Sequence, residues 1–368
     1  MYIIQLLAFY LSSALYSIFA PSSTAHPGDA TDEWADVTIP GTLPPLRASR
    51  GVVTYHPWYQ DFRARPVADC LAFAAQLSCG YVRGDVRWSD VLPDGIHPDE
   101  QAIAWYRSYL QAHRWYGLRP MIVLSQPPAA VLRLSCQVDK HMDYWQAYVA
   151  LVAERFGDVC DSYQVMNEPN NPRYRFFPPN HQGAAITVAA DAIHAHAPGA
   201  QIIVNMLMDL SNWRDFMRQL LNAAGRAIDA IGIDHYPGTW TLSDTTDWVG
   251  FIALAHEVAN AGPDSPWRDV RLALIETGFA TNAPWLRTDS SQARYFDEVN
   301  RIISQVDALR PGGLLSHVGI YELVDLNSNA ILDPEGHFGL LTSSLARKEA
   351  SFSAVARLLA SSDAQPQS

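Results

Sequence analysis

Eight short apolar segments recur along the chain, separated by stretches in which apolar residues have a helical spacing. The segments are residues 51–55, 81–85, 119–124, 163–166, 201–205, 230–234, 270–275 and 317–321. Between two of them, Trp145, Tyr148, Val149, Val152 and Phe156 place one apolar stripe along a helix. This alternation predicts βα units around a parallel sheet. Eight such units fit a closed (β/α)₈ TIM barrel in a single α/β domain, because a doubly wound sheet usually has fewer strands.

Composition agrees with one large globular enzyme-sized domain. The chain has 368 residues, of which 48% are hydrophobic and 17% charged, and this balance excludes a mainly disordered chain. The 26 Lys and Arg against 38 Asp and Glu give a net charge of -12. A surface of that sign repels phosphate backbones, so we expect no nucleic-acid partner. It also mildly disfavours strongly anionic glycans.

The first 25 residues have the pattern of a secretory signal peptide. Residues 2–19 are uncharged and mostly apolar, and Ser23-Thr24-Ala25 offers a small-residue cleavage site. We therefore expect a secreted or periplasmic protein with no stable membrane insertion after cleavage. Because no Lys or Arg precedes the apolar stretch, an uncleaved membrane anchor is the alternative. Residues 26–47 are expected to form an irregular lead-in, residues 48–360 the barrel and residues 361–368 a frayed tail.

Four cysteines, Cys70, Cys79, Cys136 and Cys160, are compatible with disulfides in an oxidising compartment or with buried thiols. Four thiols allow three pairings, and the spacing does not choose among them. The spacing matches no zinc site, and no nucleotide fingerprint is present, so we expect neither a metal nor an organic cofactor.

Two glutamates stand at predicted strand ends, where barrels build their active sites. The fourth strand ends in Asn167-Glu168-Pro169 and the seventh in Glu276-Thr277. Burial of an unpaired carboxylate costs several kcal/mol, and a salt bridge at the rim is the alternative for one isolated Glu. Two carboxylates across one barrel mouth are what a glycosidase needs, and a separation of about 5 Å predicts the retaining mechanism.

The runs Asn-Glu-Pro at 167–169 and Glu-Thr-Gly at 276–278 resemble the acid/base and nucleophile motifs of the clan A glycoside hydrolases, which are retaining (β/α)₈ enzymes. Three further runs are most similar to glycoside hydrolase family 39, in particular its bacterial exopolysaccharide-cleaving members, and next to family 5. These runs are YVRGDVRW at 81–88, YEL at 321–323 and HFGL at 337–340.

The resemblance implies a role for each matching residue. Glu276 is the expected nucleophile, Glu168 the acid and base, and Asn167 the partner of the sugar 2-hydroxyl. Two nearby carboxylates do not both ionise at neutral pH. Arg83 and Tyr236 are expected to hold Glu276 ionised, so that Glu168 keeps its proton.

One position departs from the pattern of many relatives, which carry His-x-Tyr after the sixth strand. Here Asp234 stands where that His is expected, followed by His235 and Tyr236. Strand alternation places Asp234 and Tyr236 on the inward face. Other candidate sugar contacts share a place at strand ends or in rim loops: Asp234, His56, Gln126, Asn205, Glu322, Asp325, Trp58, Trp88, Trp240, Trp267 and Trp285, with Trp240 and Trp285 the preferred stacking residues. For each tryptophan taken singly, packing in the core or in a loop is the alternative, and for Glu322 and Asp325 the alternative is an ion pair.

The sequence thus predicts a retaining glycosidase that cleaves O-glycosidic bonds of a polysaccharide or oligosaccharide. Two alternatives remain open. A transglycosylase would use the same covalent intermediate, and a catalytically silent barrel would only bind carbohydrate. Sugar identity, linkage and oligomeric state are not determined by these motifs.

Overall fold

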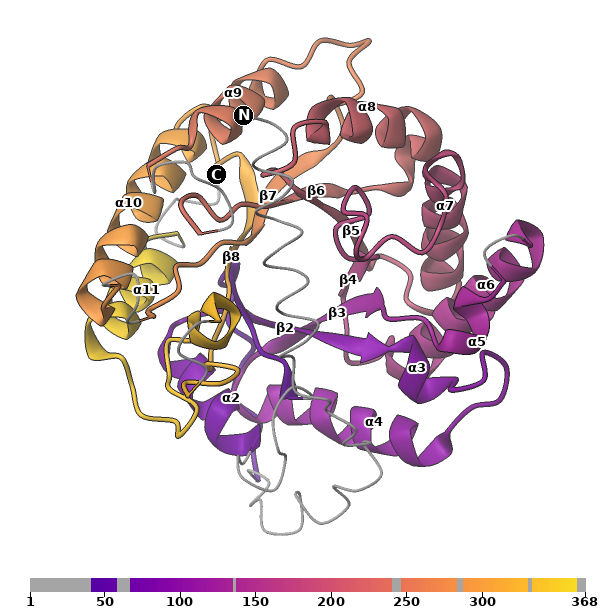
Figure 1. Ribbon diagram of the computed structural model, residues 1–368, viewed down its shortest axis with the longest axis horizontal. Helices are drawn as coiled ribbons and strands as arrows, with labels where there is room; N and C mark the ends of the chain where they lie inside the picture. The colour runs from indigo at the N-terminus through magenta and orange to yellow at the C-terminus, as the bar shows by residue number, and fades with distance from the viewer. Residues whose placement is uncertain are drawn as a thin grey trace.

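The strands form one closed parallel barrel in the computed structural model, which describes residues 41–57, 67–134, 137–239, 246–282, 287–329 and 333–362. Each strand pairs with its neighbours in chain order, and β8 pairs with β1 (Figure 1). The strands are β1 (Gly51–Thr54), β2 (Tyr81–Arg87), β3 (Arg119–Ser125), β4 (Ser162–Val165), β5 (Gln201–Leu207), β6 (Ala230–Asp234), β7 (Arg271–Glu276) and β8 (Leu315–Ile320). The predicted TIM barrel is confirmed.

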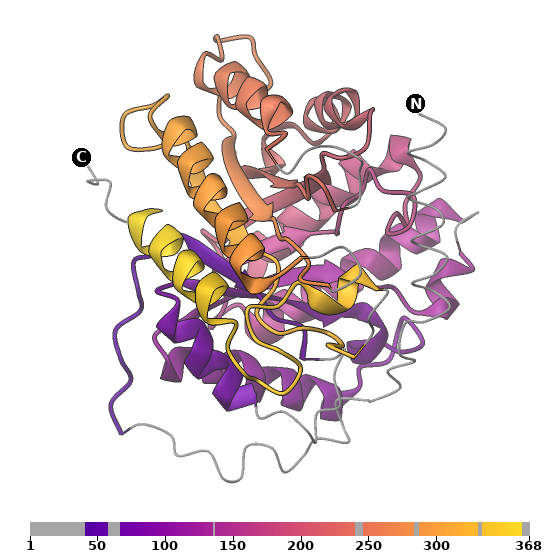
Figure 2. The same ribbon diagram turned by 60° about the vertical axis from the view of Figure 1, so that its left-hand side comes forward.

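Helices surround this ring, as Figures 1 and 2 show. The longer ones are α2 (Val67–Gln76), α4 (Glu100–Trp115), α6 (Val138–Phe156), α7 (Pro179–His196), α8 (Trp213–Ala224), α9 (Val249–Ala259), α10 (Asp289–Asp307) and α11 (Glu349–Ser362). Shorter turns are α3 (Trp88–Val91), α5 (Ala129–Leu132), η4 (Gly225–Ala227) and η6 (Pro334–His337). Helix α11 continues two residues into the segment expected to fray.

Local sequence explains where several helices begin. The side chain of Asp99 accepts hydrogen bonds from the backbone N–H groups of Gln101 and Ala102, so it caps α4. Thr288 and Ser291 form a reciprocal capping box at the start of α10. These caps satisfy backbone donors that a helix cannot satisfy within itself.

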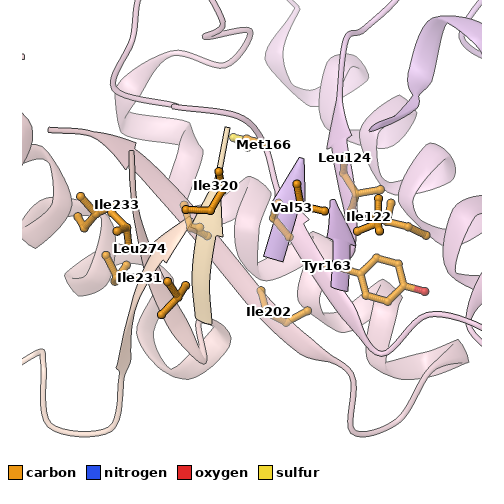
Figure 3. Packing of buried hydrophobic residues seen from close by; sticks show 14 of the residues in the cluster. Val53, Ile122, Leu124, Tyr163, Met166, Ile202, Ile231, Ile233, Leu274 and Ile320 are labelled. Atoms are coloured by element: carbon orange, nitrogen blue, oxygen red, sulfur yellow. The ribbon is translucent and has the colours of Figure 1, made fainter. Parts of the chain in front are cut away.

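The strands have two buried faces with different neighbours. Outward side chains join the layer between sheet and helices, and Figure 3 shows Val53, Ile122, Ile202 and Leu274 among them. Inward side chains form a smaller cluster that fills the barrel: Val52, Met121, Ile203, Ala230, Ala273 and Ile275. Consecutive residues therefore alternate between the two clusters, as a pleated strand requires. Polar side chains replace this inner filling toward the carboxyl ends of the strands.

Three cysteines in the described ranges, Cys70, Cys79 and Cys160, are buried and are not joined to one another by a disulfide. Cys136 lies outside the described residues, as does the expected signal segment 1–25 and most of the expected lead-in. Within the ranges that the structure covers, no helix has the length and apolar character needed to cross a membrane.

Candidate active site

A cavity of about 420 Å³ opens at the carboxyl ends of the strands. Every strand or the segment directly after it contributes to its wall: His56, Arg83, Ser125, Glu168, Leu207, Tyr236, Glu276 and Tyr321, in the order β1 to β8. This is the end at which TIM barrels carry their active sites. Both predicted catalytic carboxyls therefore face one space.

An irregularity in the pairing of β6 with β7 decides where Glu276 points. Ile233 pairs with Leu274, but the next residue, Asp234, pairs with Glu276, so Ile275 is skipped in the register. Because Ile275 belongs to the cluster inside the barrel, strict alternation would direct Glu276 outward. A β-bulge adds one residue and re-aims the side chain that follows. Glu276 consequently lines the cavity.

Two proton-bearing groups hold the carboxylate of Glu276. Arg83 Nη2 lies 2.6 Å from Glu276 Oε1, and the hydroxyl of Tyr236 donates a hydrogen bond to Glu276 Oε2. Burial lowers the pKa of Arg83, but the negative charges of Glu276, Asp234 and Asp85 together outweigh this effect and leave that pKa raised. Burial, followed by the same charge, raises the pKa of Tyr236 well above its usual value. Both partners therefore stay protonated, and each offers a proton to an oxygen of the Glu276 carboxyl.

Glu168 has the opposite environment. Burial raises its pKa to about 8, and the negative charge of Glu276 acts in the same direction. A hydrogen bond from Asn171 Nδ2 to Glu168 Oε2, 2.7 Å long, opposes the shift by favouring the carboxylate. At neutral pH Glu168 therefore keeps its proton. The two glutamates of this cavity thus have different electrostatic environments, and such a difference is how paired carboxyls divide the roles of acid and nucleophile.

The chain turns sharply after β4 and so places Asn167 and Glu168 side by side on the wall. Met166 has a φ of 65° and Glu168 a φ of 42°, values in the left-handed region that side chains other than Gly adopt infrequently. Strain of this kind persists where the surroundings determine the conformation, and it clusters at functional sites. Here the backbone N–H of Glu168 donates to Asn205 Oδ1 at 2.9 Å, which fixes the turn.

Asn167 has its amide oriented by its neighbours. Its Oδ1 accepts hydrogen bonds of 3.1 Å from each of three groups: Arg83 Nη2, Gln164 Nε2 and Asn205 Nδ2. This network assigns the amide oxygen to the barrel interior. The Nδ2 group is then the donor that Asn167 can offer to a ligand in the cavity.

The expected sugar contact at Asp234 is corrected by the structure. Asp234 is fully buried and does not line the cavity; its Oδ2 accepts a hydrogen bond from Asn205 Nδ2. Burial raises its pKa well above the ordinary value, and the charges of Glu276 and Glu168 add to this. Asp234 therefore orients Asn205, which in turn holds Asn167 and the backbone of Glu168.

The alternation expected after the sixth strand is present. Asp234 and Tyr236 face inward, whereas His235 turns away and contacts Asp209 Oδ1 at 3.1 Å and the carbonyl of Asp247 at 2.7 Å. Asp209 also accepts from the backbone N–H of Tyr236. His235 thus supports the segment that carries Tyr236.

His56 lines the cavity as expected and is held by a chain of polar groups. His56 Nδ1 lies 3.2 Å from Asp85 Oδ2, and the Ser125 hydroxyl donates to Asp85 Oδ1 at 2.6 Å. Burial alone would raise the pKa of Asp85, but His56 and Ser125 lower it. Asp85 is therefore a carboxylate that orients the His56 ring, and all three side chains form part of the wall. Gln126 lies beside them in the lining.

Glu322 also requires a correction, because it is buried but absent from the cavity lining. Burial raises its pKa well above the ordinary value, followed by the charges of Glu335 and Asp325. Asp325 itself forms an ion pair of 2.7 Å with Lys348. Both acids belong to the packing of the loop after β8 rather than to the cavity wall.

Of the five candidate stacking tryptophans, two are buried and three lie outside the described residues. Trp88 is fully buried and stacks on Tyr148, with ring centroids 5.0 Å apart. Trp267 is buried before β7, at the opposite end of the barrel, where its Nε1 donates to Glu257. For these two tryptophans the structure shows the packing alternative, because their rings belong to the layer between sheet and helices and do not line the cavity. Trp58, Trp240 and Trp285 lie outside the described residues.

Asn171 and Glu335 are two of the lining residues that escaped the sequence-based prediction. Asn171, which binds Glu168, stands one position beyond the Asn-Glu-Pro-Asn run, and the adjacent asparagines were the available signal. Glu335 lies on η6, accepts a hydrogen bond of 2.6 Å from the Tyr321 hydroxyl and has its pKa raised by burial to about 7. Glu335 belongs to an irregular loop that folds back over the barrel mouth. Such a loop has no periodic pattern of apolar residues from which its position could be predicted.

No family model matches the chain. Two curated relatives align over short segments: the 6-phospho-beta-glucosidase AscB of Escherichia coli (strain K12), 28% identical over 116 residues, and the chloroplastic Beta-glucosidase-like SFR2 of Oryza sativa subsp. japonica, 28% identical over 111 residues. The segments amount to 30% and 27% of this chain but only 24% and 17% of those relatives' lengths.

Similar solved structures extend over most of the barrel. A beta-glucosidase from Thermotoga maritima in complex with deoxynojirimycin has a TM-score of 0.65 at 11% identity, covering 87% of this chain and 99% of its own. A family 39 glycoside hydrolase from Bacteroides cellulosilyticus WH2 has a TM-score of 0.63 at 17% identity, with coverages of 86% and 65%. The exo-beta-1,4-mannosidase Op5Man5 from Opitutaceae bacterium strain TAV5 has the same score and identity, with coverages of 88% and 62%. These likenesses show that the chain has the TIM-barrel fold of known glycosidases.

Proposed function

We propose that this protein is a retaining glycoside hydrolase of the clan A type that cleaves a polysaccharide or oligosaccharide. The observation that carries the proposal is the pair Glu168 and Glu276 in one cavity, the first with a pKa raised to about 8 and the second bound by Arg83 and Tyr236. Retaining enzymes need one carboxylic acid and one carboxylate on the two sides of the glycosidic bond. The glycosidase neighbours and the motif resemblance to family 39 support the same reaction class.

In the first step the ionised Glu276 attacks the anomeric carbon while Glu168 gives its proton to the departing glycosidic oxygen. A covalent glycosyl-enzyme ester forms and the alcohol leaves. Asn167 Nδ2 donates to the sugar 2-hydroxyl, a contact that strengthens as positive charge develops in the ring. Arg83 and Tyr236 keep Glu276 in place before the attack.

In the second step the roles of Glu168 reverse. Once Glu276 is an ester, its negative charge no longer raises the pKa of Glu168. The Glu168 carboxylate, which Asn171 stabilises through its Nδ2 group, then accepts a proton from water as the water attacks the anomeric carbon. The ester breaks, the sugar leaves with its original anomeric configuration, and both carboxyls return to their starting states.

Substitution of the two glutamates tests this assignment. E276Q should lower turnover of aryl glycosides by about 10⁴-fold or more, because the nucleophile is lost. E168A should still form the glycosyl-enzyme from a glycoside with an acidic phenol, but should hydrolyse it slowly until azide replaces water as the second nucleophile. Mass spectrometry of the trapped protein locates the sugar on Glu276.

A matched control is E298Q on α10, whose side chain pairs with Arg301 on the outer surface. E298Q should retain wild-type turnover. Substantial activity in E276Q, or a product of inverted configuration by proton NMR, would refute the mechanism. Products formed at high acceptor concentration distinguish hydrolysis from transglycosylation.

We also propose that the protein is exported from the cell. The support for export is the uncharged, mostly apolar character of residues 2–19.

A further inference from the structure

One side of the cavity must receive the leaving group. Glu168 protonates the departing oxygen, so under the proposed function the leaving group lies against the wall that flanks Glu168. That wall consists of the loop after β4 and the turn after β3. Its lining includes Leu132, Arg173, Tyr174, Arg175 and Phe176. The charge and polarity of these side chains therefore indicate what kind of leaving group this wall can bind.

The loop after β4 is fixed relative to Glu168. Asn171 holds the Glu168 carboxyl with its side chain, and its carbonyl accepts hydrogen bonds from the backbone N–H groups of Tyr174 and Arg175. Its Oδ1 accepts from the backbone of Arg173 at 3.1 Å. At the other end, Phe176 is buried against Trp145, with ring centroids 5.4 Å apart. The loop presents Arg173, Tyr174 and Arg175 from a defined turn beside the acid.

Apolar surface is exposed at this wall. Tyr174 is 43% exposed and Leu132 is 47% exposed, although most large apolar side chains in the described ranges are buried. The guanidinium of Arg173 lies 5.5 Å from the centre of the Tyr174 ring and supports its orientation. A flat ring and an aliphatic side chain at the mouth of a polar cavity suit the face of a sugar ring.

Positive charge accompanies this surface. Deeper in the cavity, Arg83 is paired with Glu276 and Asp85 lies beside His56. Arg173 and Arg175 are both exposed at the mouth. Arg175 forms no ion pair with any carboxylate in the part of the chain that the structure describes. Burial raises the pKa of Glu335 to about 7, and the charge of Arg173 opposes part of this rise.

We propose that this wall is a leaving-group subsite for a sugar that carries a carboxylate, such as a uronic acid unit. Tyr174 and Leu132 contact the ring, and Arg173 and Arg175 bind the carboxylate. Guanidinium groups match the planar geometry of a carboxylate and bind it through paired hydrogen bonds. This proposal rests on the proposed function, because the role of Glu168 as the acid determines on which side of the cavity the leaving group lies. It narrows the substrate class to a glycan with an acidic unit on the reducing side of the cleaved bond.

The test compares aryl glycosides that share a sugar and differ only in the aglycone, which is 4-carboxyphenyl or the neutral 4-carbamoylphenyl group. Binding is measured by calorimetry in E276Q at low and high salt, over a panel of common sugars. The carboxylate member should bind about five- to tenfold more tightly at low salt, and the preference should shrink at high salt because salt screens exposed charges. R173Q/R175Q should lose the preference.

R226Q/R268Q is the matched control. It removes the same charge from exposed arginines in the segments leading into β6 and β7, at the opposite end of the barrel, and should keep the preference. Equal affinities for the two glycosides, including no measurable binding of either, would refute the subsite, as would a preference that survives in R173Q/R175Q. A 4-sulfonatophenyl glycoside that binds more tightly than the carboxylate would also contradict it. Turnover of the same panel by the wild type tests the proposed function separately, because binding in E276Q does not depend on catalysis.

Discussion

Glu168 and Glu276 have the same side chain but different surroundings. The proposed mechanism depends on this difference in surroundings. Glu276 meets a guanidinium and a phenol that both donate to it. Glu168 is buried beside that negative charge and accepts a hydrogen bond from Asn171. The environment alone distinguishes the proposed acid, Glu168, from the proposed nucleophile, Glu276.

This environment sets the pH dependence of the reaction. In the proposed mechanism Glu168 acts in its protonated form, so kcat/KM should fall as pH rises through about 8, the value to which burial and Glu276 raise its pKa. E276Q removes the neighbouring charge and should lower the pKa of Glu168. The fall of kcat/KM at high pH is measured with the wild-type enzyme. The pKa of Glu168 in the wild type and in E276Q is measured by carbon NMR of protein with labelled glutamate. Equal Glu168 pKa values in wild type and E276Q would contradict the proposed coupling.

At the scale of elements, the site depends on how β7 lies between its neighbours. The pairing irregularity at Ile275 turns Glu276 into the cavity, and β8 closes against β7 through Gly319. A Cβ at Gly319 would stand 1.9 Å from the carbonyl oxygen of Ile275, so the backbones are too close for any side chain there. The bulge and this close approach together fix the carbonyl next to the proposed nucleophile.

G319A should therefore disturb both stability and catalysis. The extra methyl group pushes β7 and β8 apart beside Glu276, and we expect unfolding free energy to drop by about 3 kcal/mol, the upper range for overpacking. Urea unfolding and kcat of the purified variant measure the two effects. G262A is the matched control, because a Cβ at Gly262 meets nothing within 4 Å and should change neither quantity. Wild-type stability in G319A would show that the strands separate freely.

For the whole molecule, the last helix completes the structure begun by the first strand. Helix α11 packs beside α10, as Figures 1 and 2 both show, and its Leu359 covers Gly51 at the start of β1. A Cβ at Gly51 would stand 3.1 Å from the Leu359 side chain. The last helix and the first strand thus pack against each other. We therefore expect the barrel to unfold as one cooperative unit.

L359A should lower the unfolding free energy by about 2–5 kcal/mol, because it leaves a cavity between α11 and β1. The loss should appear in a single urea transition seen alike by fluorescence and by circular dichroism, since the whole barrel unfolds together. L43A, at a side chain 47% exposed, is the matched control and should change stability by less than about 0.5 kcal/mol. Two separate transitions in L359A would contradict a single cooperative barrel.

The net charge of the protein and the local charge at the cavity mouth have different effects on an anionic substrate. A net charge of -12 repels a dense polyanion as it approaches the surface. A single carboxylate that reaches Arg173 and Arg175 is bound over a few ångströms, where local groups dominate the field. The proposed substrate is accordingly a glycan with isolated acidic units rather than a highly charged polymer.

The sequence by itself determined the barrel and the two strand-end glutamates. Eight apolar runs with helical stretches between them leave few folds that bury every run, and Asn167-Glu168 and Glu276 stand directly at the ends of two of them. Only the tertiary structure decided which polar groups face the cavity. A skipped register position turns Glu276 inward, Asp234 ends beneath the wall against Asn205, and Glu335 returns to the mouth from an irregular loop. These outcomes depend on pairing register and on contacts between residues far apart in the chain, which local periodicity does not encode.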